Sequence, residues 1–244
     1  MTDFVLVHGA WHGAWCWKKI LPELWRAGHR AFPVSLTGVG ERAHLLAPAV
    51  TLATHVEDVC RVIEAEELSE AVLVGHSYAG MVITGVADRV DAGRLSHLVY
   101  LDAVLPDPGQ AWSSGQDAKT QATRREAIEA NGGAMPPPNP EVFGLQGADH
   151  AWVKRRQTSH PGGTYDSVLD FDPARVQRWP RTFIDCTQPA LPTIAASRLR
   201  VRAEPGWHVE EIATGHDPMV SAPTDLLRCL LAAARRSGGT PPQP

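Results

Sequence analysis

The stretch LVGHSYAG, Leu73 to Gly80, decides the fold of this chain. It nearly matches G-x-S-x-G, the sharp strand-to-helix turn that exposes a serine at the end of a strand. The pattern expects glycine at position 79, where this chain has Ala79 followed by Gly80. One methyl group is the smallest possible intrusion into such a turn, so we expect the turn to form. Ser77 is then a candidate nucleophile; the alternative is a serine that merely caps the following helix.

The rest of the chain alternates between apolar runs typical of buried strands and segments with helical spacing. Strands are expected at Phe4 to Gly9, Arg30 to Leu36, Ala71 to Gly75, Leu95 to Ala103, Arg181 to Cys186 and Gly206 to Ala213. Helices are expected at Ile20 to Gly28, Thr54 to Glu66, Tyr78 to Arg89 and Pro223 to Arg235. This alternation predicts an α/β fold with a mostly parallel sheet and helices on both faces.

One long segment, from about Asp107 to Asp172, breaks the alternation. It contains MPPPNP and several glycines, and it has no convincing strand. A connection of this length is unusual in a compact domain, so we expect a small helical cap inserted over the carboxyl ends of the strands. The expected organisation is a core over residues 1–106 and 173–236, a cap over 107–172, and a disordered Pro- and Gly-rich tail over 237–244.

Composition excludes several classes of function. The chain has 244 residues and a net charge of −4, which favours one domain and disfavours nucleic acid as a partner. It contains no apolar run long enough for a membrane span, and its N-terminus lacks the features of a secretory signal, so we expect a cytoplasmic protein that acts on a small molecule. The 4 cysteines form no C-x-x-C pair, so we expect free thiols and no structural zinc. Oligomeric state stays open, with a homodimer as one option.

An activated serine needs a base and a group that orients the base. In folds with this turn the chain order is serine, acid, histidine. The segment ATGHDPMVSAP, from Ala213 to Pro223, places His216 between the last expected strand and the last helix. His216 is therefore the candidate base, whereas His8, His12 and His76 are interpreted as residues that shape loops.

The same turn predicts an oxyanion hole made of two backbone N–H groups. One should come from Tyr78, which follows the nucleophile, and the other from the loop after the first strand. We assign the second donor to Ala10, because glycines flank it in HGAWHG and let the backbone approach a substrate closely. The candidate pocket walls are aromatic and suit an apolar or aromatic substrate. They are Trp11, Tyr78, Trp112, Phe143 and Trp152.

Five motifs together resemble the α/β-hydrolase superfamily, and more narrowly the plant methylesterase and hydroxynitrile lyase group with its bacterial relatives. They are VHGAWHGAWCW (Val7 to Trp17), LTGVGER (Leu36 to Arg42), GHSYAG (Gly75 to Gly80), VYLDAVLPD (Val99 to Asp107) and TGHDPM (Thr214 to Met219). The resemblance implies ester hydrolysis by Ser77 and His216 without a cofactor or a metal. Lyases of this group have lysine after the catalytic histidine; this chain has Asp217, which would repel a leaving cyanide and disfavours that reaction.

The expected triad acid is missing from its usual place in this family. The resemblance puts an aspartate at about Pro189, after the strand RTFIDC. We expect Asp102 to replace it, because in some α/β-hydrolases, such as haloalkane dehalogenases, the acid follows the preceding strand in a similar pattern. Asp185 and a triad without any carboxylate remain alternatives, and Asp217 adjoins His216 too closely to orient its ring.

The sequence therefore predicts a serine hydrolase that cleaves a small-molecule carboxylic ester through an acyl-enzyme. A methyl or aryl ester from secondary metabolism would fit. Lactone opening, C–C cleavage or a non-hydrolytic rearrangement on the same fold remains an alternative. So does a non-catalytic receptor for a small ligand, since a fold does not fix a function.

Overall fold

The computed structural model describes residues 1–236, and its core is a parallel sheet. This sheet has 6 strands in the order β10-β9-β4-β3-β1-β2, and every neighbouring pair is parallel. The strands are β1 (Asp3–Val7), β2 (Arg30–Val34), β3 (Ala71–His76), β4 (Leu95–Leu101), β9 (Arg181–Cys186) and β10 (Trp207–Ile212). The predicted fold class is confirmed.

Burial explains why the central strands read as continuous apolar runs. Every residue of β3 is buried, because β1 and β4 flank it and helices cover both faces. The edge strand β2 is only partly buried and contains Pro33, which has no N–H to donate to a ladder and is tolerated at an edge.

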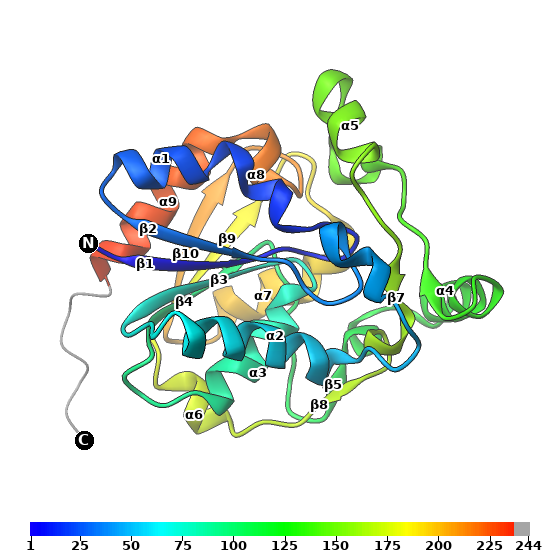
Figure 1. Cartoon of the computed structure of the whole chain (residues 1–244), viewed down its shortest axis with the longest axis horizontal. Coiled ribbons are helices and arrows are strands. Elements are labelled where there is room, and N and C mark those ends of the chain that lie inside the picture. Colours follow the sequence, from blue (N-terminus) through cyan, green and yellow to red (C-terminus); the bar gives the residue numbers. More distant parts are fainter. Residues whose placement is uncertain (237–244) are drawn as a thin grey trace.

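Helices cover the sheet on both sides. Figure 1 shows α1 and α9 on one face and α2 and α3 on the other. The helices of the core are α1 (Leu21–Arg26), α2 (Leu52–Ala65), α3 (Ala79–Arg89), α6 (Pro173–Gln177), α7 (Ala195–Ala203), α8 (Pro218–Ser221) and α9 (Pro223–Arg236). Short 3₁₀ helices are η1 (Ala14–Lys19), η2 (Gly40–Leu45) and η6 (Pro192–Ile194).

The segment between β4 and α6 lies at the end of the sheet toward which the strands run (Figure 1). Its helices are η3 (Trp112–Gly115), α4 (Ala118–Ala130), η4 (Pro140–Phe143), α5 (Gly147–Lys154) and η5 (Gly162–Thr164). We keep the name cap for residues 107–172. The expected disordered tail, 237–244, lies outside the described residues.

One expectation about secondary structure was wrong, and one helix was missed. The cap was expected to contain no strand, but it has two antiparallel pairs of two-residue strands. They are β5 (Gln110–Ala111) with β8 (Val168–Leu169), and β6 (Ala134–Met135) with β7 (His160–Pro161). Strands this short carry no alternating pattern. Helix α7 was not predicted, because its arginines interrupt an apolar face.

The four cysteines are free thiols, as expected. Among residues 1–236, none of the helices has both the length and the apolar character needed to cross a membrane.

Gly80 allows the helix after the serine turn to pack against the chain that follows β4. A Cβ atom at Gly80 would lie 2.0 Å from the carbonyl oxygen of Val104. Helix propensity alone would make alanine better than glycine at this position by about 1 kcal/mol. The clash is with backbone, which cannot move aside cheaply, so overpacking should outweigh propensity.

We therefore expect Gly80→Ala to lower the free energy of unfolding by about 1–3 kcal/mol in urea denaturation. Gly93→Ala is the matched control, because a Cβ there meets no atom within 4 Å. It should change stability by no more than about 0.5 kcal/mol. A Gly80→Ala protein as stable as the wild type would show that this contact is not tight.

Candidate active site

Ser77 lies in the turn between β3 and α3, and its backbone has a φ of 57°. This left-handed conformation is strained for a serine, and the surrounding backbone holds it. The Ser77 N–H donates to Leu101 (3.1 Å), and the Ser77 carbonyl accepts from Gly80 (3.1 Å) and Val104 (3.0 Å). The turn that the sequence predicted therefore forms, with Ala79 buried inside it.

Two glycines make room for this turn, one just before it in the chain and one in the loop after β1. A Cβ at Gly75 would lie 2.7 Å from the carbonyl oxygen of Ala79. A Cβ at Gly9, in the loop after β1, would lie 2.8 Å from the Cβ of Ser77. The backbone of the loop His8–Ala10 therefore packs directly against Ser77, with no room for a side chain at Gly9.

His216 lies in the loop between β10 and α8, and its ring contacts both Ser77 and Asp102. Its Nε2 is 2.8 Å from the Ser77 Oγ, and its Nδ1 is 2.7 Å from the Asp102 Oδ2. A proton on Nδ1 would be donated to the carboxylate and would leave Nε2 free to accept from the serine hydroxyl. Ser77, His216 and Asp102 are thus brought together as a chain of hydrogen bonds.

Asp102 follows β4 and is fully buried. Its backbone φ is 40°, and its N–H donates to the Ile184 carbonyl on the neighbouring strand β9 at 2.7 Å. Pro189 stands where the resemblance expected the acid, and its ring packs near Gly144 of the cap. Of the candidate acids, Asp102 is the one whose carboxylate contacts the His216 ring.

Arg198 of α7 was missed by the sequence analysis, although it holds the other oxygen of Asp102. Its Nη2 is 2.6 Å from the Asp102 Oδ1, and its Nε is 2.5 Å from the Asp185 Oδ1. Arg202 binds the second oxygen of Asp185 at 2.7 Å. Asp185 therefore positions Arg198 rather than His216. No motif marks this arginine, and only a prediction of α7 could have suggested it.

Asp217 makes no hydrogen bond to the His216 ring in the described part of the chain, and its carboxylate lies in a buried cluster with His12 and His76. Its Oδ2 is 3.3 Å from the His12 Nε2, and its Oδ1 is 3.5 Å from the His76 Nε2. Burial alone would raise the pKa of Asp217, but the charge and the hydrogen bond of His12 outweigh burial and lower this pKa to about 2. Burial alone would lower the pKa of His12, but Asp217 outweighs it and raises that pKa.

His76 supports the backbone of His216. Its Nε2 is 2.8 Å from the His216 carbonyl oxygen. Burial, reinforced by His216, lowers the pKa of His76 well below its ordinary value, so the ring is neutral and its Nε2–H donates to that carbonyl. On the other side, the His216 N–H donates to the Phe143 carbonyl of the cap at 2.9 Å.

The two expected oxyanion donors, Ala10 and Tyr78, are both buried beside the serine turn. Within residues 1–236, neither backbone N–H makes a hydrogen bond to another group of the protein. The loop that carries Ala10 is held by His12, whose Nδ1 is 2.8 Å from the Ala10 carbonyl oxygen. Both donors are therefore available to an outside acceptor.

A cavity of about 270 Å³ opens over Ser77 and His216. Trp11, Trp112 and Phe143 line it, as expected. Its remaining lining residues are Val104, Gln116, Arg124, Pro138, Val142, Leu191, Thr193 and Ile194.

Two expected wall residues do not line this cavity. The Trp152 ring packs edge-on against Trp15, with ring centroids 5.1 Å apart, because α5 turns it toward η1. The Tyr78 side chain is fully buried, and its hydroxyl bonds to the His55 Nδ1 at 3.0 Å. Nothing in the sequence distinguished these two rings from the three that face the cavity.

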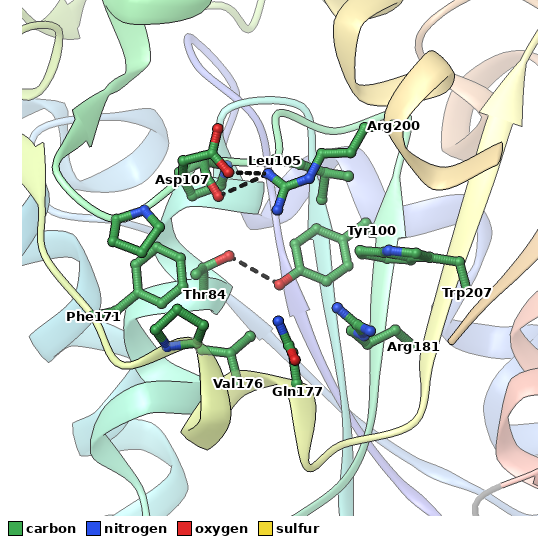
Figure 2. Close-up of a pocket in the computed structure, with 13 residues that line it drawn as sticks. Thr84, Tyr100, Leu105, Asp107, Phe171, Val176, Gln177, Arg181, Arg200 and Trp207 are labelled. Carbon is green, nitrogen blue, oxygen red and sulfur yellow. Dashed lines mark hydrogen bonds and ion pairs between the residues drawn. The ribbon is translucent and has the colours of Figure 1, made fainter. Parts of the chain in front are cut away.

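A second hollow of about 150 Å³ lies between α6, α7 and the sheet. Figure 2 shows Tyr100 at its centre, the Arg200–Asp107 ion pair at one end, and Arg181 beside Trp207 at the other. No histidine lines it, its Thr84 and Tyr100 hydroxyls bond to each other at 2.9 Å, and its Asp107 is paired with Arg200, so it shows no nucleophile held by a base. The cavity over Ser77 is the candidate active site.

The described residues contain one group of side chains with metal-ligand spacing: His76, His216 and Asp217. Both ring nitrogens of His216 already have partners in Ser77 and Asp102, and the His76 Nε2 is occupied by a carbonyl. These contacts leave too few free ligand atoms for a metal centre.

Residues 4–228 match the family model described as "Alpha/beta hydrolase family". The chain belongs to this family. It is 40% identical over 243 residues to the carbendazim hydrolyzing esterase of Nocardioides sp. (strain SG-4G), an alignment that covers 95% of this chain and 99% of the relative. It is 33% identical over 124 residues to methylesterase 3 of Arabidopsis thaliana, covering 50% of this chain and 47% of that one.

Among solved structures, an extracellular alpha/beta-hydrolase from a Paenibacillus species superposes with a TM-score of 0.82 at 21% identity. That match covers 96% of this chain and 99% of the other. The resemblance predicted from the motifs is confirmed, and the chain is an esterase-type alpha/beta hydrolase.

The Asp217 cluster generates a prediction about stability and pH. His12 has a raised pKa in the folded protein because of Asp217. The stability that the folded protein gains from this interaction is therefore complete below pH 6.5, and it is lost as the pH rises through the folded pKa of His12. Asp217→Asn removes the partner, and burial then lowers the His12 pKa instead.

We expect Asp217→Asn to cost about 3–5 kcal/mol of unfolding free energy near pH 6, and less at pH 8.5. Urea denaturation from pH 5.5 to 8.5 measures this difference. The control is Asp149→Asn, which removes a partly exposed ion pair with Lys19 and should cost at most about 1 kcal/mol at every pH. A cost for Asp217→Asn that is constant with pH would show that His12 is not charged.

Proposed function

We propose that the protein is a serine esterase that hydrolyses small carboxylic esters through an acyl-enzyme, with Ser77, His216 and Asp102 as its catalytic triad. One observation carries the proposal: the continuous hydrogen-bonded chain from the Ser77 Oγ through the His216 ring to the Asp102 carboxylate. The protein belongs to a family with esterase relatives. Ser77 and His216 line a cavity large enough for a small substrate.

In the first half-reaction the Ser77 Oγ attacks the ester carbonyl carbon while the His216 Nε2 takes the serine proton. Asp102 fixes the tautomer of His216 and stabilises the imidazolium that forms. The oxyanion accepts hydrogen bonds from the Ala10 and Tyr78 N–H groups, each worth about 2.7–4 kcal/mol in comparable sites. The C–O bond then breaks, and the alcohol leaves with the proton from His216.

In the second half-reaction a water molecule replaces the alcohol. His216 takes a proton from the water, which attacks the acyl carbon and gives a second oxyanion in the same hole. The bond to Ser77 breaks, the serine recovers its proton from His216, and the carboxylic acid leaves. No cofactor enters this cycle.

The cavity favours a substrate with an apolar or aromatic part. Trp11, Trp112 and Phe143 present ring surfaces close to the nucleophile. Methyl and aryl esters are therefore the first substrates to test. Carbendazim, for which the Nocardioides relative is named, belongs in the same panel because the two chains align over nearly their whole lengths.

The serine is tested by intact mass after treatment with a fluorophosphonate, on wild type and on Ser77→Ala. We expect one adduct on the wild type and none on the variant. A folded wild-type protein that forms no adduct would contradict the proposal. It would favour a ligand receptor or a non-hydrolytic reaction.

The acid is tested by Asp102→Asn, compared with Asp185→Asn. Loss of the orienting carboxylate should lower kcat by roughly 10⁴-fold, as in a serine protease. Asp185→Asn should lower it far less, because Asp185 contacts Arg198 and not the His216 ring. Melting temperatures check that both variants fold, and equal losses of kcat would remove Asp102 from its special role.

A further inference from the structure

Arg124, on cap helix α4, faces the cavity over Ser77 with its guanidinium among aromatic rings. The guanidinium carbon lies 5.6 Å from the ring centre of Trp11, 5.3 Å from that of Trp112 and 5.8 Å from that of Tyr165. Arg124 is the only Lys, Arg, Asp or Glu side chain among the residues that line this cavity. A single cation therefore lies in an otherwise mostly apolar site.

This guanidinium has no carboxylate partner in the described part of the chain. Its one hydrogen bond within residues 1–236 is a weak contact from Nη1 to the Met135 Sδ at 3.6 Å. The next residue shows the contrast, because Arg125 makes two hydrogen bonds of 2.9 Å to Asp166. Burial lowers the pKa of Arg124, but arginine remains charged at neutral pH.

The rings of Trp11, Trp112 and Tyr165 form an aromatic cage around the guanidinium, and one of them, Trp11, has a strained backbone. Trp11 has a φ of 64°, which is rare for a residue other than glycine, and its Nε1–H donates to the Met135 carbonyl at 3.0 Å. This bond holds the ring face under Arg124. Trp11 and Arg124 also line an adjoining hollow of about 210 Å³, so Arg124 borders both cavities.

A structural reading is that Arg124 only braces the cap by cation–π contact. That reading accounts for the three rings, but those rings leave the N–H groups in the plane of the guanidinium without strong acceptors. A carboxylate is the acceptor whose shape matches this planar fork. The neighbouring cavity, which holds Ser77 and His216, is where such a group would arrive.

We propose that Arg124 binds an anionic group of the substrate, so that the preferred esters carry a carboxylate at a second position. The inference rests on the proposed esterase function and adds the substrate class to it. The carboxylate lies either on the acyl chain or on the leaving group.

The test uses pairs of esters in which a carboxylate on one member replaces a methyl group on the other. Monomethyl succinate, glutarate and adipate are compared with methyl butyrate, pentanoate and hexanoate by methanol release. On the leaving-group side, 4-acetoxybenzoate is compared with 4-acetoxytoluene. The proteins are wild type, Arg124→Met, Arg124→Lys, and Arg125→Met as a control on the same helix.

The quantity measured is the ratio of kcat/KM for the charged ester to that for its neutral partner. In at least one pair, Arg124→Met should lower this ratio about 10- to 100-fold, the range for a lost hydrogen-bonded charge pair. Arg124→Lys should fall between, and Arg125→Met should keep the wild-type ratio. The neutral ester reports general damage to the cavity, which cancels in the ratio.

An unchanged ratio for Arg124→Met in every pair would overturn the inference and leave Arg124 as a brace of the cap. If the wild type hydrolyses no ester, the proposed function fails first. Binding then decides the inference: calorimetric titration of monomethyl glutarate should give at least tenfold weaker binding to Arg124→Met than to wild type. Equal affinities would overturn it.

Discussion

The ion pair between Asp102 and Arg198 is the constraint on which the rest of the site depends. A fully buried carboxylate is costly unless both oxygens find partners, and here Arg198 takes one oxygen and His216 the other. Removing one partner from such a buried pair typically costs about 3–5 kcal/mol. The end of β4, helix α7 and the loop that carries His216 therefore have to form together.

The same edge of the sheet concentrates backbone strain. Trp11, Ser77 and Asp102 all have positive φ angles, and each lies in the chain just after β1, β3 or β4. Such residues cost about 1–3 kcal/mol each and persist only where neighbours fix them. Here the sheet itself does so, because Ser77 and Asp102 each donate their N–H to the next strand's carbonyl oxygens. The strained residues and the candidate active site therefore lie at the same place, the carboxyl ends of the parallel strands.

The sequence predicted the sheet and the serine turn because both depend on local patterns. Apolar runs mark buried strands, and the residues around Ser77 must be small whatever the rest of the chain does. Asp102 could be proposed from its position after a strand, but its choice over Asp185 depended on which side chain reaches His216. Arg198 and Arg124 could not be found, because no spacing rule shows that an arginine on a helix faces a buried carboxylate or an aromatic cage. The prediction that Trp152 lines the cavity was wrong for the same reason, because the direction of its side chain is set by how α5 packs.

The hydrogen bond from the His216 N–H to the Phe143 carbonyl ties the cap to the loop that carries the base. The two segments pack tightly here, because a Cβ at Gly215 would lie only 2.2 Å from the Phe143 carbonyl oxygen. If the cap swung away at Phe143 to admit a ligand, it would pull on the backbone beside the imidazole. The position of the cap at Phe143 and the position of the backbone that carries the catalytic imidazole are therefore coupled in this structure.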